Sequence, residues 1–224
     1  MKWADSDYLA ARYLLLERMV VQGCILANTA IEKYLKALYA YLEIPIPRSH
    51  AVQALHREVT AAGKITLGLN VAFLKLLQKA YGLRYPDDLP DDFNIALNQM
   101  KVLAELDRTV SAITKCFPFR EGTTDFVLAR AAKAGDQRYL ARNVVLNPEQ
   151  ASDFFTSNSQ SFEFRKHRPL VIEVEYLSPR VPDDGLFDQE GAVLIPDKGI
   201  KDIKSAFPRG AGKIKHKDMF DWPK

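Results

Sequence analysis

The stretch CILANTAIEKYLKALYAYLEI, residues 24–44, decides the fold class of this chain of 224 residues. Its apolar side chains recur every three or four residues, which is the period of one face of an α-helix. The positions on this face are Ile31, Leu35, Leu38 and Leu42. Glu32 precedes Lys36 by one turn on another face, in the favourable order for an intrahelical ion pair. Pro45 follows and cannot continue the helix, so a single long helix is expected to end there.

Helical patterns also lie on both sides of this stretch. A stripe at helical spacing before it predicts another helix, which starts near Asp5 or Ser6. The residues on one face of this helix are Tyr8, Arg12, Leu15 and Met19. Gly23 interrupts the apolar run and predicts a turn. After the prolines, further helices are expected over 49–63, 69–81 and 93–117. The sequence therefore predicts a mainly α protein whose residues 1–119 form a five-helix antiparallel up-and-down bundle.

The sequence changes character after residue 119, where proline and glycine become more frequent and the helical period weakens. Residues 120–224 are predicted to form a small α+β appendage. Its expected strands are DQRYLARNVVL (136–146), SFEF (161–164), LVIEVEYL (170–177) and GAVLIP (191–196). Asn147 is expected to cap a short helix over 147–158.

Composition describes an ordinary soluble globular protein, with 47% hydrophobic and 26% charged residues and a net charge of +3. No apolar run approaches the roughly 20 residues that a membrane helix needs. The start of the chain lacks the basic-then-apolar order of a signal peptide. Cys24 and Cys116 lack partners at metal-ligand spacing and are expected to be buried thiols. These features predict a cytoplasmic protein.

Three segments in order carry a family resemblance: QGCILANTAIEKYLKALYAYLEI (22–44), PRSHAVQAL (47–55) and YGLRYPDD (81–88). Together they resemble the HEPN domain, a helical bundle common in prokaryotes. The resemblance covers about the first half of the chain. The second half resembles no family.

The resemblance implies a helical bundle that forms two-fold dimers. Some HEPN proteins are metal-independent ribonucleases, often toxins of toxin–antitoxin pairs, and others accompany nucleotidyltransferases and bind nucleotides or RNA. The ribonucleases carry an arginine and a histidine separated by four to six residues. Here acidic residues follow Arg84, and only Arg209 and His216, outside the resembling region, have that spacing. The resemblance therefore implies a module without catalysis, and no cofactor or metal is expected.

A ligand cleft is predicted from the residues of these segments: Glu32, Lys36, His50, Arg84 and Tyr85. The planar guanidinium of Arg84 suits a phosphate, and Tyr85 can stack on a base. Structural roles are the alternatives. Arg84 would then pair with Glu32 and order its loop, the Glu32–Lys36 pair would be a solvated helix face, and His50 would cap or pack.

A second, basic set of residues could follow a nucleic-acid backbone: Arg165, Lys166, Arg168, Lys213 and Lys215. A solvated sheet edge is the alternative for the first three. The acids of the loop after Arg84 lack the spacing of a calcium site and are expected to be solvated: Asp87, Asp88, Asp91 and Asp92.

The function predicted from the sequence is thus a dimeric nucleotide- or RNA-binding module. Two alternatives stay open. One is a metal-independent ribonuclease with a non-standard site, such as His50 with Arg84. The other is an interaction module, one half of a two-component pair, that binds a partner protein or itself through an apolar surface.

Overall fold

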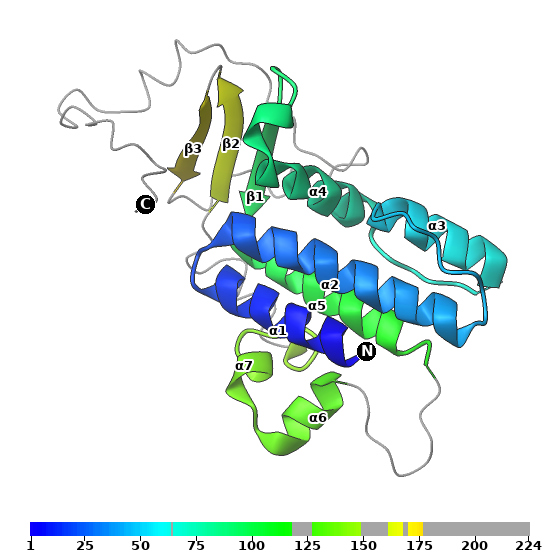
Figure 1. Ribbon diagram of the computed structural model, residues 1–224. Coiled ribbons are helices and arrows are strands. Elements are labelled where there is room, and N and C mark those ends of the chain that lie inside the picture. The colour runs from blue at the N-terminus through cyan, green and yellow to red at the C-terminus, as the bar shows by residue number, and fades with distance from the viewer. Residues whose placement is uncertain (64, 118–126, 149–160, 168–169, 177–224) are drawn as a thin grey trace, which may run out of the picture. The chain divides into compact units, whose positions relative to one another are not determined.

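The computed structural model describes residues 1–63, 65–117, 127–148, 161–167 and 170–176 (Figure 1). All of them belong to the first of the two units into which the chain divides, Met1–Val193. The predicted helix over 147–158 lies largely outside the described residues, and the predicted strand over 191–196 and the basic tail lie entirely outside them.

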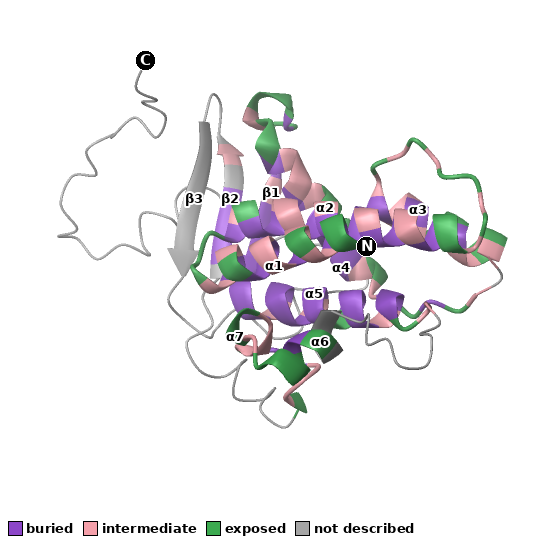
Figure 2. Cartoon of the chain, turned by 60° about the horizontal axis from the view of Figure 1, so that its bottom comes forward, coloured by how far each residue is buried: buried purple, intermediate pink, exposed green. Residues whose placement is uncertain are grey.

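Five helices dominate the first part of the chain: α1 (Lys2–Leu16), α2 (Val20–Tyr41), α3 (Val52–Gly63), α4 (Val71–Tyr81) and α5 (Gln99–Thr114). Helix α2 lies at the centre and packs against the other four. Its predicted core residues Ile31, Leu35 and Leu38 are fully buried, and buried positions also run the length of α5 (Figure 2). The mainly helical prediction is confirmed, while the specific five-helix up-and-down arrangement stays a prediction. Within the described residues, no helix is long and apolar enough to cross a membrane.

The predicted turn at Gly23 is wrong, because Gly23 is a buried residue inside α2. A Cβ at this position would lie 2.7 Å from Cγ of Leu15 on α1. Glycine is therefore used here for close approach of two helices rather than for a turn. The chain turns earlier, at Arg18, which has a φ of 65°.

The predicted start of the last long helix at Phe93 is also wrong. Residues Asn94–Asn98 form strand β1, and α5 begins only at Gln99, where the side chain of Asn98 accepts a hydrogen bond from Lys101 N at 3.0 Å. This strand pairs antiparallel with β2 (Ser161–His167), far along the chain. A partner so distant in sequence leaves no local signal, which is why the helical pattern was extended across the strand.

The sheet has the order β1-β2-β3, with β3 at Leu170–Tyr176. It confirms the strands predicted at 161–164 and 170–177. Two further helices, α6 (Val127–Ala134) and α7 (Gln137–Leu140), follow the first five (Figure 1). The strand predicted over 136–146 is therefore wrong: Asp136 accepts from Arg138 N at 3.1 Å and caps α7 instead. The domain boundary at 119 stays a prediction, although α7 packs on α1 and β2 pairs with β1.

A buried ionic network joins α1, α5 and the end of α7. Arg12, on the stripe predicted to be apolar, donates to both carboxylate oxygens of Asp107, and both residues are 0% exposed. The guanidinium also donates to the carbonyls of Arg138, at 3.3 Å, and Ala141. Tyr8 donates to Asp107 at 2.7 Å. Burial raises the pKa of Asp107, and Arg12 opposes part of that rise. The network satisfies a buried charge from three elements at once.

Candidate functional site

Helix α2 presents the first part of the predicted site. Glu32 and Lys36 lie one turn apart, and Lys36 Nζ is 2.9 Å from Glu32 Oε1. Glu32 is largely buried, with 9% of its surface exposed. The predicted intrahelical pair is therefore formed, and its carboxylate lies where the helix meets its neighbours rather than on an open face.

His50 completes this group from the segment just before α3. Ser49 Oγ accepts from Ala51 N at 3.1 Å, which shapes the turn that leads into the helix. The Nδ1 atom of His50 lies 2.8 Å from Glu32 Oε1, although the imidazole side chain is 73% exposed. Glu32 therefore holds both Lys36 and His50, and the three residues form one polar cluster. The other ring nitrogen of His50 has no partner among the described residues.

Arg84 lies in a different segment, the turn that follows α4. Helix α4 ends at Tyr81 and continues into two short 3-10 turns, Gly82–Arg84 and Pro86–Asp88. The guanidinium carbon of Arg84 is 4.7 Å from the ring centre of Tyr81 and 5.4 Å from that of Tyr85. One guanidinium nitrogen, Nη1, also donates to the Tyr81 hydroxyl. Both Arg84 and Tyr85 are exposed.

The expected ion pair between Arg84 and Glu32 is not formed within the described residues. Glu32 is occupied by Lys36 and His50, and Arg84 by two aromatic rings. A ring face attracts a cation without neutralising its charge, so Arg84 keeps its positive charge at an exposed position.

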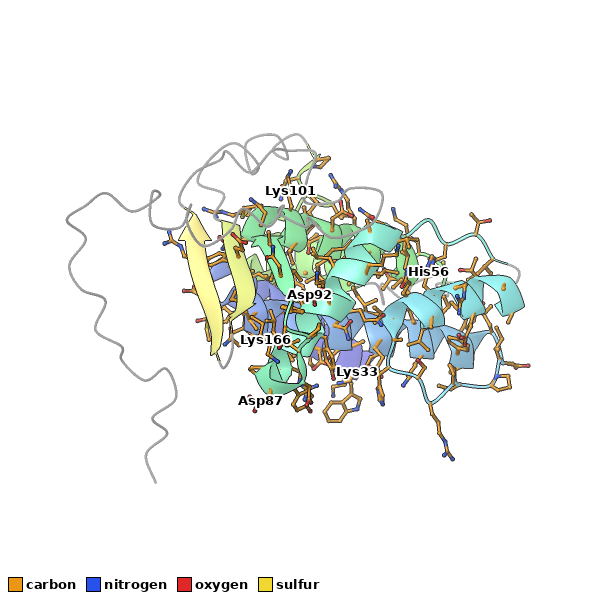
Figure 3. The ribbon with its side chains drawn as sticks, turned by 90° about the horizontal axis from the view of Figure 1, so that it is seen from above. Lys33, His56, Asp87, Asp92, Lys101 and Lys166 are labelled. Atoms are coloured by element: carbon orange, nitrogen blue, oxygen red, sulfur yellow. The ribbon has the colours of Figure 1, made fainter. Side chains whose placement is uncertain are left out.

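Lys166 of β2 braces the loop that follows Arg84. Its ammonium donates to the carbonyls of Asp87, at 3.1 Å, and Leu89 (Figure 3). Its backbone nitrogen donates to Phe93 O at 2.9 Å. Lys166 was predicted to contact a nucleic-acid backbone, yet its ammonium is engaged with this loop. In the described part of the chain, no group of three His, Cys, Asp or Glu side chains gathers that could hold a metal ion.

Comparison with known proteins assigns the helical half. Residues 1–110 match the family model of the HEPN domain. This part of the chain belongs to the HEPN domain family. Neither a curated protein nor a solved structure matches the chain. The HEPN domain thus contains all five predicted ligand residues, whereas residues 111–224 match no family model.

The HEPN domain presents these five residues as two groups rather than as one demonstrated cleft. Glu32, Lys36 and His50 are joined by direct contacts, and Arg84 and Tyr85 by a ring contact. Among the described residues, no hydrogen bond, ion pair or ring contact joins the two groups. None of the five lines the pocket of about 630 Å³ between α3 and α4.

The remaining members of the basic set are not described. Arg165 lies on β2, but the structure does not describe its side chain, and Arg168, Lys213 and Lys215 lie outside the described residues. Arg209 and His216 lie outside them too. Their roles stay predictions.

Sequence reasoning missed two contacts that position the loop around Arg84, although Lys166 itself was named as a nucleic-acid contact. Tyr81, three residues before Arg84, supplies the closer ring, and this spacing in a helical segment was a usable signal. Lys166 gave no such signal, because its contact depends on the pairing of strands far apart in the sequence.

Proposed function

We propose that the HEPN domain binds a nucleotide or RNA without catalysis, with Arg84 as the phosphate contact. One observation carries this proposal: an exposed guanidinium lies against the rings of both Tyr81 and Tyr85. Membership of the HEPN family suggests the same class of ligand.

The chemistry of this arrangement suits a nucleotide. Arginine offers a rigid fork of donors that matches phosphate oxygens. Only Nη1 has a partner among the described residues, so the remaining donors are available to a ligand. Tyr85 is 56% exposed, which leaves ring surface for stacking on a base. The ring contacts restrict the guanidinium before binding, which lowers the entropy lost when a ligand arrives.

The Glu32–Lys36–His50 cluster is the proposed second contact. Its exposed imidazole can donate or accept a hydrogen bond at a base or sugar edge. The HEPN domain lacks the spaced arginine–histidine pair of the ribonucleases of the family, which supports binding without cleavage.

Binding of labelled single-stranded RNA and of ATP, in the presence of a chelator, tests this proposal. Arg84→Ala is expected to weaken binding by about tenfold or more, and Arg84→Lys by less. Arg108→Ala is the matched control, because Arg108 is an exposed arginine paired with Glu105 on α5. A folded Arg84→Ala protein that binds both ligands as well as the parent would refute the proposal.

A specific contact favours a second candidate, the metal-independent ribonuclease. The carboxylate of Glu32 lies within hydrogen-bond distance of Nδ1 of an exposed His50. A carboxylate in this position orients an imidazole for proton transfer. RNA that shortens in the presence of a chelator, and stays intact with His50→Ala, would establish this candidate. Glu32→Gln tests the orienting carboxylate: it should reduce such cleavage while leaving RNA binding measurable.

Homodimers and a partner protein from a two-component pair also stay proposals. Salt dependence separates them from RNA binding, because phosphate contacts weaken steeply with added salt whereas an apolar interface does not.

A further inference from the structure

A pocket of about 630 Å³ lies between α3, α4 and the segment that joins them. Its size falls within the roughly 300–1,000 Å³ of small-molecule sites. Its lining begins at Ala51 and ends at Gln78, and it contains none of the residues of the proposed nucleotide site.

Hydrogen bonds fix the walls of this pocket. His56 of α3, labelled in Figure 3, places Nε2 at 2.9 Å from the carbonyl oxygen of Leu67. A carbonyl only accepts, so Nε2 carries the proton and the imidazole ties α3 to the joining segment. Thr60 donates to His56 O at 2.8 Å, and Asn70 caps α4 by accepting from Phe73 N at 3.2 Å. The contact of His56 with Leu67 therefore holds α3 against the joining segment at the pocket.

Small and aliphatic side chains make most of its surface. Ala54 and Ala61 leave space along α3, and Ile65, Leu67 and Val71 supply branched apolar surface opposite. Val71 is 43% exposed, so burying it under a ligand removes apolar surface from water.

The charged side chains of the pocket lining are of one sign, positive. Arg57 contributes a guanidinium, and among the described residues no aspartate or glutamate lines the pocket. Arg57 is exposed and forms no ion pair with the described residues, unlike Arg12, Arg108 and Arg130. Gln53 and Gln78 add amide groups that can donate or accept.

From these features we infer that the pocket binds a small organic anion with an apolar body. The body lies against Ala54, Ile65 and Val71, and the anionic group bonds to Arg57. The charge of the lining selects an anion over a cation of the same shape. This site is independent of the proposed nucleotide site.

Three probes that share one ring system test the inference on the full chain: 1-naphthoate, neutral 1-naphthylmethanol and cationic 1-naphthylmethylamine. Fluorescence titration is expected to rank their affinities in that order. Arg57→Gln should weaken naphthoate binding by roughly fivefold, as for a partly exposed charge pair, and leave the neutral probe unchanged. Ala61→Phe, at an exposed position of α3, should fill the pocket and weaken all three.

Two controls separate this site from others. Arg108→Gln removes an exposed arginine elsewhere, and Arg84→Ala removes the proposed phosphate contact; neither should change naphthoate binding. The inference is overturned if no probe binds, if the three bind equally, or if naphthoate binds Arg57→Gln and Ala61→Phe as it binds the parent. A loss with Arg84→Ala instead would assign the probe to the nucleotide site and would also overturn it.

Discussion

Arg12 and Arg84 lie in opposite surroundings. Arg12 is 0% exposed, and its donors go to a carboxylate and to two backbone carbonyls. Arg84 is exposed, and it contacts two neutral rings. The charge of Arg12 is balanced by the carboxylate of Asp107. The charge of Arg84 is not balanced by its ring contacts, which orient the guanidinium. Removing one partner of the interior network would leave a buried charge unpaired, whereas the exposed arginine keeps the charge that the proposed ligand site requires.

The largest loss of stability is expected when the interior network of Arg12 is disrupted. Arg12→Met leaves Asp107 buried without its partner, so the free energy of unfolding should fall by about 3–5 kcal/mol. Urea unfolding measures it. Adding Asp107→Leu removes the orphaned carboxylate and should restore part of the loss. Arg84→Ala should change stability by less than about 0.5 kcal/mol, and an equal loss in both single variants would contradict the comparison.

Substitution of two glycines compares the same two regions. The larger of the two losses in stability is expected to be about a third of that for Arg12→Met. Gly23→Ala places a Cβ 2.7 Å from the buried Leu15 side chain, and the resulting overpacking should cost about 1–2 kcal/mol. Gly82→Ala, beside Arg84, meets Leu89 at 3.2 Å and keeps a helical backbone, so about 0.5 kcal/mol or less is expected. Thermal unfolding compares the two, and a more damaging Gly82→Ala would reverse the ranking of the regions.

A smaller effect is expected at the exposed loop. Lys166→Met removes the ammonium that donates to the carbonyls of Asp87 and Leu89. Because the contact is partly exposed, a loss of about 1 kcal/mol is expected. Amide hydrogen exchange should accelerate over residues 85–93 while α2 stays protected. Unchanged exchange in the loop would show that β1–β2 pairing alone orders it.

The smallest effect concerns reactivity rather than stability. Burial raises the pKa of the Cys24 thiol to about 12, so almost no thiolate exists at pH 8 and a thiol reagent should not label it in the folded protein. Cys116 is partly exposed and its pKa is also raised, so it should react slowly. Mass spectrometry of labelled peptides measures whether Cys116 is labelled before Cys24. Unfolding in urea should remove the difference between the two labelling rates.

Local patterns predicted most of the helical half. Helices α2 and α4 were predicted because their apolar period lies within the segment itself, and Pro45 marks the end of the first. Strand β1 and the charged pair of Arg12 escaped prediction, since the partner of each lies 60 residues or more away in the sequence. An arginine on an apolar stripe was nevertheless a signal that a buried acid should be sought.

The site was predicted in the same uneven way. Glu32–Lys36 followed from helical spacing, and His50 and Arg84 from the ordered motifs of the family. The contact of His50 with Glu32 and the ring contacts of Arg84 depend on how helices and turns meet, which spacing alone does not give.

The pairing of β1 with β2 has a consequence for biosynthesis. As the chain leaves the ribosome, α1 to α5 can associate early, but β1 emerges some 60 residues before the strand that pairs with it. Until then its edge is unpaired, and Ile95 and Leu97, which are buried in the finished protein, lack part of their cover. A polypeptide that stops at residue 119 would keep that edge permanently, together with an Arg12 deprived of the carbonyls of Arg138 and Ala141. Such a fragment should aggregate where the whole chain does not.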